Sequence, residues 1–203
     1  MRRTTQEART FHLWSLSEEV TIEQGADGGA LLLTSRWGQD RLDRPSPAVR
    51  EVLRRMELGP VLLDNALEGY EDQCLLALST LGELSHLVVR TLGMDDLKGP
   101  LLSVVPVSSA VAPFVLMRPP GERRVRLPRH VSFSVPEPGA GCVLQSACSS
   151  YQVVLHRPEA AWVATALAWP TTLTAVAAAL PLPPRVTGDV IGYLGAAGLV
   201  AVA

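Results

Sequence analysis

Alternating and helically spaced apolar residues divide the first half of the chain into strands followed by helices. Runs with strand character cover residues 11–16, 20–23 and 30–35, and an Asp-Gly-Gly sequence between the last two is typical of a tight hairpin turn. Ser46 and Pro47 suit the N-cap and the first turn of a helix. That helix has apolar residues at the spacing of one buried face, Val49, Val52, Leu53 and Met56.

Two further helices and a pair of strands follow. A short helix fits residues 62–67, and a longer one runs from about Glu71 to Ser85. Residues 87–90 and 101–107 have the pattern of two strands that form a β wing. The longer helix is predicted to bury four leucines, Leu75, Leu78, Leu81 and Leu84. Strands, three helices and a wing are the order of a winged helix-turn-helix domain with added N-terminal strands.

The second half of the chain repeats these landmarks. Gly29–Ser35 has a counterpart in Gly141–Ala147, and Arg44–Val49 has one in Arg157–Trp162. The second copy would contain strands at 131–135, 141–147 and 151–155, helices from about Trp162, Leu173 and Pro184, and a wing strand at 199–202. We therefore predict an α+β protein of two tandem winged helix-turn-helix domains, each with a small antiparallel sheet and three helices.

Composition shifts place the domain boundaries. The first domain is predicted at 10–112, a Pro- and Arg-rich linker at 113–129, and the second domain at 130–203. The wing strand at 199–202 is followed by no second strand. Because unpaired strand edges are usually covered, we expect a second copy of the protein in a homodimer, or another protein chain, to complete this edge.

Composition limits the compartment. The chain has 203 residues, of which 47% are hydrophobic and 19% charged, and this balance excludes disorder over most of its length. No apolar stretch is long enough to span a membrane, and no apolar signal core follows the start of the chain. Three cysteines, Cys74, Cys142 and Cys148, share no metal-binding spacing and suit reduced thiols. We expect a cytoplasmic protein with no membrane partner.

Charge and motifs argue against several chemistries. The net charge is −2, and the predicted recognition helix of the first copy begins with Glu71 and Asp72, so nucleic acid is not favoured as a partner. The four histidines are scattered singly, and neither a nucleophile elbow nor a glycine-rich phosphate loop occurs. The sequence thus predicts no metal, no cofactor and no catalytic residue. A winged-helix DNA-binding regulator remains the alternative of a different class.

The tandem layout resembles a known family. In the first copy the resemblance rests on residues 41–50, Leu53 and Gly59-Pro60, and in the second on segments at 141–146, 153–158, 169–171 and 198–200. These look like the N-terminal region of flavin-dependent azoline dehydrogenases of the SagB/ThcOx type. In that family the region resembles tandem domains that bind the leaders of ribosomal peptides, and it precedes a nitroreductase-like FMN domain. The chain ends before such a domain would begin, so no flavin or catalytic residue is carried over.

The resemblance implies a non-catalytic recognition or scaffold protein in the biosynthesis of a ribosomally synthesised, post-translationally modified peptide of the azole or thiopeptide type. Its partners would be the precursor leader peptide and a modifying enzyme such as a flavin dehydrogenase or a cyclodehydratase. A non-catalytic subunit of a split FMN-dependent dehydrogenase is a further alternative. The leader would add as a strand beside the third helix of a copy. Candidate peptide-binding residues are Arg41, Leu42, Asp43, Gln73 and Leu76 in the first copy, and Tyr151, Val153, Arg185 and Asp189 in the second.

Overall fold

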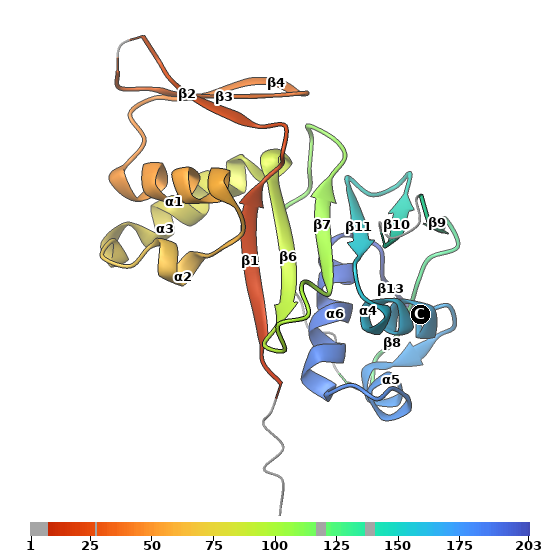
Figure 1. The fold of residues 1–203 in the computed structure, drawn as a ribbon. Helices are drawn as coiled ribbons and strands as arrows, with labels where there is room; N and C mark the ends of the chain where they lie inside the picture. The colour runs from red at the N-terminus through yellow and green to blue at the C-terminus, as the bar shows by residue number, and fades with distance from the viewer. Residues whose placement is uncertain (1–7, 27, 117–120, 137–140) are drawn as a thin grey trace, which may run out of the picture. The chain divides into compact units, whose positions relative to one another are not determined.

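The computed structural model describes residues 8–26, 28–116, 121–136 and 141–203. Within them the chain is a mixed α and β protein with six α-helices and several small antiparallel sheets (Figure 1). The predicted combination of helices with small antiparallel sheets is therefore confirmed. None of the helices in this described part is long and apolar enough to cross a membrane.

The elements before residue 107 follow the predicted order, with two additional strands. They are β1 (Thr10–Leu16), β2 (Thr21–Gln24), β3 (Leu31–Ser35), β4 (Gly38–Leu42), α1 (Pro47–Leu58), β5 (Val61–Leu62), α2 (Leu63–Ala66), a 3-10 turn (Glu71–Gln73), α3 (Cys74–Glu83), a 3-10 turn (Ser85–Leu87), β6 (Val88–Met94) and β7 (Leu102–Pro106). The strands that the sequence pattern did not predict are β4 and the two-residue β5.

The elements after residue 123 repeat this order. They are β8 (Arg124–Arg126), β9 (Val131–Ser134), β10 (Cys142–Ser146), β11 (Tyr151–Leu155), α4 (Pro158–Ala166), β12 (Thr171–Thr172), α5 (Leu173–Ala179), α6 (Pro184–Ala196) and β13 (Ala201–Val202). Each series runs strand, three-stranded meander, helix, short strand, two helices and strand. Pro47 and Pro158 each begin the first helix of their series. The structure therefore matches Pro158 with Pro47, whereas the alignment of the two sequence segments matched it with Pro45, two residues earlier.

Contacts divide the chain into two compact units. The N-terminal unit comprises Leu13–Thr91 and Val105–Phe114, and the C-terminal unit comprises Met1–His12, Leu92–Val104 and Val115–Ala203. This grouping places residues 92–104 with the second half of the chain, whereas the sequence pattern placed them in a domain at 10–112. The domain bounds at 112 and 130 stay predictions.

The N-terminal unit packs helices beneath a meander. β3 pairs with β2 on one side and with β4 on the other, both antiparallel. Ser46 caps α1, because its hydroxyl accepts a hydrogen bond from the backbone N–H of Val49. The face predicted for α1 is buried as expected and joins one hydrophobic cluster with α3, whose core members include Leu33, Val52, Leu53, Met56, Ala77, Leu81 and Leu84.

The C-terminal unit contains the second meander and a separate small sheet. Its strands follow the order β1-β6-β7-β11-β10-β9. Of the first three strands, only residues 10–12, 92–94 and 102–104 belong to this unit. β8 lies between β12 and β13 in the small sheet.

The position of β8 corrects the prediction that the wing strand lacks a partner in this chain. β13 pairs with β8, with Ala201 opposite Arg126 and Val202 opposite Val125. Its partner β8 comes from the segment that was predicted as a linker because of its arginines. Val125 alternates with two of these arginines in β8 and is 2% exposed, so the segment forms a strand with one buried side chain. The premise that another chain must complete this wing therefore fails.

Candidate functional site

The third strand of the first meander has one open edge. Among the described residues β4 pairs with β3 alone, in a register that sets Leu33 opposite Asp40. In antiparallel ladders, residues alternate between pointing their backbone N–H and C=O toward one neighbour and pointing them away from it. The bond from Gly25 N to Ala30 O (3.0 Å) fixes this alternation, and it directs the N–H and C=O of Gln39 to the outer edge. β4 thus offers backbone groups of the kind that pair with an added strand.

The inner face of β4 is connected to the end of α3. Asp40 Oδ2 lies 2.9 Å from Nε2 of His86, which is in the 3-10 turn after α3. Leu42, at the other end of the strand, packs against the hydrophobic core. These contacts fix the position of β4 relative to the 3-10 turn after α3 and to the hydrophobic core.

α3 presents leucines to solvent on its outer side. Ala77 and Leu81 are 0% and 1% exposed and face the core. Leu75, Leu76 and Leu78 are 82%, 55% and 39% exposed. The prediction that Leu75 and Leu78 are buried is wrong, because α3 turns the small Ala77 rather than its neighbours toward α1. The prediction that Leu81 and Leu84 are buried is confirmed. We call β4 together with these three exposed leucines the β4–α3 surface.

The other predicted residues of the first copy lie around this surface. Arg41 and Asp43 are exposed and form an ion pair, with Nε and Oδ1 2.7 Å apart. Gln73 precedes α3 and accepts a hydrogen bond from the backbone N–H of Ala48 at Oε1 (3.5 Å), so its side chain joins the starts of α3 and α1. Of the two leucines predicted for the first copy, Leu42 and Leu76, Leu76 is the more exposed, at 55%.

The strand predicted to bind a peptide in the second copy is enclosed. Tyr151 and Val153 are 2% and 0% exposed. β11 lies between β10 and β7 in the sheet, and the N–H of the following residue, His156, donates to Leu101 O (3.0 Å). A peptide strand could add to β11 only by displacing β7.

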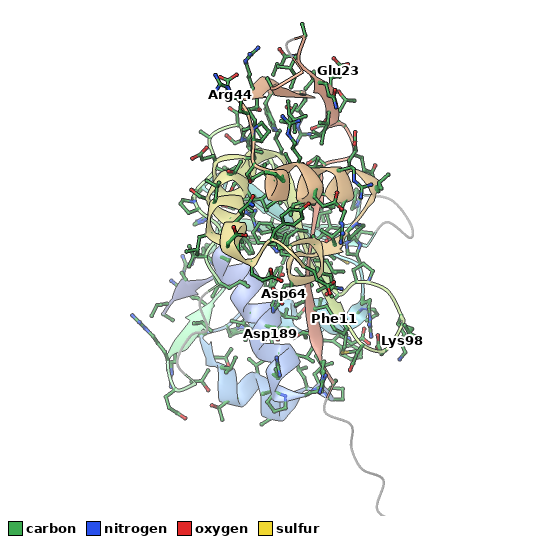
Figure 2. The ribbon with its side chains drawn as sticks, turned by 90° about the vertical axis from the view of Figure 1, so that its left-hand side faces the viewer. Phe11, Glu23, Arg44, Asp64, Lys98 and Asp189 are labelled. Atoms are coloured by element: carbon green, nitrogen blue, oxygen red, sulfur yellow. The ribbon has the colours of Figure 1, made fainter. Side chains whose placement is uncertain are left out.

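The helix predicted to line that second groove is also covered. Every residue of α6 from Val186 to Leu194 is buried. Asp189 (Figure 2) accepts a hydrogen bond from Thr10 Oγ1 at 2.5 Å. Arg185 is exposed at the first turn of α6 and is not brought to these buried residues. The predicted residues of the second copy thus do not form one accessible surface.

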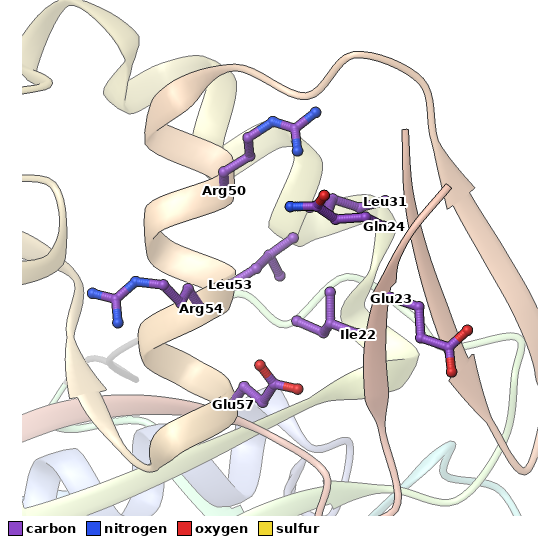
Figure 3. A pocket seen from close by; sticks show the side chains of 8 residues that line it. All are labelled: Ile22, Glu23, Gln24, Leu31, Arg50, Leu53, Arg54 and Glu57. Carbon is purple, nitrogen blue, oxygen red and sulfur yellow. The ribbon is translucent and has the colours of Figure 1, made fainter. Parts of the chain in front are cut away.

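A pocket lies at the opposite edge of the first meander, where no site was predicted from the sequence. It has a volume of about 250 Å³ and lies between β2 and α1, lined by Ile22, Glu23, Gln24, Leu31, Arg50, Leu53, Arg54 and Glu57 (Figure 3). Its helical members recur at i, i+3, i+4 and i+7, a stripe that charged residues mask in the sequence pattern. We call it the β2–α1 groove.

Two features bear on nucleic acid and metals. The turn before α3 is acidic, and the backbone N–H of Gly69 donates to Glu71 (3.0 Å) and lowers the pKa of its carboxyl. α3 itself contains no lysine or arginine. Within the described residues, no group of three or more His, Cys, Asp and Glu side chains could hold a metal ion. The arrangement at the β4–α3 surface suits non-covalent binding of an extended chain.

Comparison with known proteins gives no family. No protein-family model matches the chain, and no curated protein matches it significantly.

Proposed function

We propose that this chain is a non-catalytic recognition protein in the biosynthesis of a ribosomally synthesised and modified peptide. In this proposal the leader of the precursor adds as a strand to the outer edge of β4 and rests its side chains on α3. A modifying enzyme, such as a flavin dehydrogenase or a cyclodehydratase, acts on the peptide held there.

One contrast between the two series of elements carries the proposal. In the second series, the third strand of the meander is flanked by β7 and the third helix is buried from Val186 to Leu194. In the first series, the corresponding strand β4 ends its sheet, and the corresponding helix α3 buries only Ala77 and Leu81. Contiguous exposed leucines on a monomer commonly mark a binding surface. An added peptide strand would pair with the open edge of β4 and cover the exposed side of α3. In the second series, other parts of this chain already pair with β11 and bury α6.

The repeated order of elements supports an interpretation of the chain as two tandem winged-helix units, of which the first is available to a peptide. Cys74, Cys142 and Cys148 are free thiols, and a reducing compartment such as the cytoplasm suits three unpaired cysteines.

Fluorescence anisotropy with the full chain tests the proposal. The probe is a labelled leader segment of a precursor peptide encoded beside the gene of this chain. We expect saturable binding at micromolar concentration or below. Leu76→Asp should weaken it at least about tenfold, because the charge opposes burial of the helix face.

The matched control is Leu58→Asp, which places the same charge at a leucine of α1 that is 79% exposed. This variant should bind like the wild type. No saturable binding to the intact chain, an equal effect of the two substitutions, or a gene neighbourhood without any precursor peptide would contradict the proposal.

A further inference from the structure

The β2–α1 groove combines an apolar floor with the open edge of a strand. Ile22, Leu31 and Leu53 form the floor, and Leu53 is 0% exposed. In Figure 3 the side chain of Ile22 points from β2 toward Leu53 of α1. The pocket of about 250 Å³ over this floor has room for an apolar side chain from outside the meander.

The backbone of β2 at this groove is oriented for pairing. The hydrogen bond from Gly25 N to Ala30 O shows that Gly25 points its backbone groups toward β3. Because this direction alternates along an antiparallel strand, Gln24 and Ile22 point their N–H and C=O away from β3. β2 ends its sheet among the described residues. Both residues whose backbone points outward also line the pocket. A strand that pairs with β2 would thus place alternate side chains over the floor of the groove.

Two arginines and two glutamates line the groove, and the side chain of Glu23 points away from α1 (Figure 3). Arg54 is held by Glu51 through Nε and Nη2 at 3.0 and 2.9 Å. Arg50 donates to the backbone oxygens of Pro45 (3.3 Å) and Gly29. Glu57 lines the same pocket and has no ion pair within the part of the chain that the structure describes. Both arginines are thus already engaged, and the carboxylate of Glu57 is left to attract a cation.

We propose that the β2–α1 groove binds a second extended peptide segment, in which a leucine-sized side chain enters the pocket and a lysine or arginine two residues away pairs with Glu57. This site lies at the opposite edge of the meander from β4 and does not depend on the function proposed for the β4–α3 surface. It gives one small sheet two edges for strand addition, each beside a different helix.

Two labelled nine-residue peptides test the inference with the full chain. The first has a central leucine with lysines two residues before and after it, so that all three share one face of a strand. The second has glutamates in place of the lysines. We expect the lysine peptide to bind at least about tenfold more tightly than the glutamate peptide, and the difference should shrink at high salt.

Variants locate the binding. Glu57→Lys, at an exposed position, should abolish the preference for the lysine peptide, and Ile22→Asp should weaken binding of both peptides. Leu76→Asp, on the β4–α3 surface, is the control and should leave the binding unchanged, whether or not that surface binds a leader. Equal affinities for the two peptides, no effect of Glu57→Lys, or loss of binding in Leu76→Asp would overturn the inference. Because Glu57 is exposed, its variant gives an answer even if Ile22→Asp fails to fold.

Discussion

Thr10 on β1 donates a hydrogen bond of 2.5 Å from Oγ1 to Oδ2 of Asp189 on α6, and the two residues are 8% and 4% exposed. Asp189 was predicted to bind peptide because it lies on the third helix of the second copy, beside which a leader strand would add. The structure instead gives this carboxylate a partner within the C-terminal unit. Its contribution to folding can therefore be separated from any contribution to binding.

Asp189→Leu should lower the free energy of unfolding by about 1–3 kcal/mol, because it leaves the buried hydroxyl of Thr10 without this acceptor. Asp189→Asn keeps an acceptor oxygen and should cost less. Urea unfolding followed by circular dichroism measures both. Neither variant should change leader affinity, and a variant of full stability with weakened peptide binding would contradict the assignment.

Arg157 is predicted to stabilise the C-terminal unit through two carboxylates. It donates to Asp96 at 2.9 and 2.8 Å and to Glu159 at 2.6 and 3.3 Å, and this contact lowers the pKa of each acid. Arg157→Met should cost about 2 kcal/mol, since the two acids lose a buried partner but keep some contact with water. The stabilisation should be present above the unfolded pKa values of the acids, which are about 4, and fade as the pH falls through their lowered folded values.

The control for this substitution is Arg54→Met on the surface of α1. Arg54 and Arg55 together lower the pKa of Glu51 to about 2, yet the side chain of Arg54 is 59% exposed. Water screens such a pair, so the urea midpoint should hardly move. Equal losses in the two variants would contradict the importance assigned to burial of Arg157.

His156 should make stability depend on pH near neutrality. Its Nε2 lies 2.9 Å from Ser103 Oγ, and burial lowers the pKa of the imidazole below its ordinary value. The unfolded chain then binds more protons just below about pH 6.5, so the free energy of unfolding should fall as the pH drops through this range. His156→Gln, which keeps a hydrogen-bonding group, should reduce the difference between urea midpoints at about pH 5.5 and 7.5. An unchanged difference would contradict this role.

The orientation of α3 gives a further stability test. Leu81→Ala should cost about 2–5 kcal/mol because it opens a cavity in the core. Leu75→Ala, on the same helix, should change stability by no more than about 0.5 kcal/mol because the side chain already faces water. Thermal and urea unfolding of the two variants would reveal a different rotation of the helix if Leu75→Ala proved the more damaging.

Local signals predicted much of this structure. Ser46 and Pro47 fix the start of α1, and its apolar spacing fixes the buried face, because both depend only on residues within two helical turns. The hairpin between β2 and β3 likewise follows from its glycine-containing turn.

Features that depend on distant residues were not predicted. β4 reads as polar because only its inner face meets the core, and β8 pairs with strands far along the chain. The pairing of β7 with β11 and the hydrogen bond from Thr10 to Asp189 likewise join residues from opposite halves of the sequence. Of the candidate site, the sequence identified Leu76 and the vicinity of β4. It did not identify the groove at β2, whose stripe on α1 mixes Leu53 with charged residues.

Hydrogen exchange of the full chain tests the central claim most directly. With a saturating leader segment, strand addition should slow exchange of the Gln39 amide at least about tenfold, because that N–H would gain a partner. The amides of Ile22 and Gln24, on the opposite edge, should exchange at their original rates in this experiment. Saturable binding without slower exchange at Gln39 would contradict strand addition at β4.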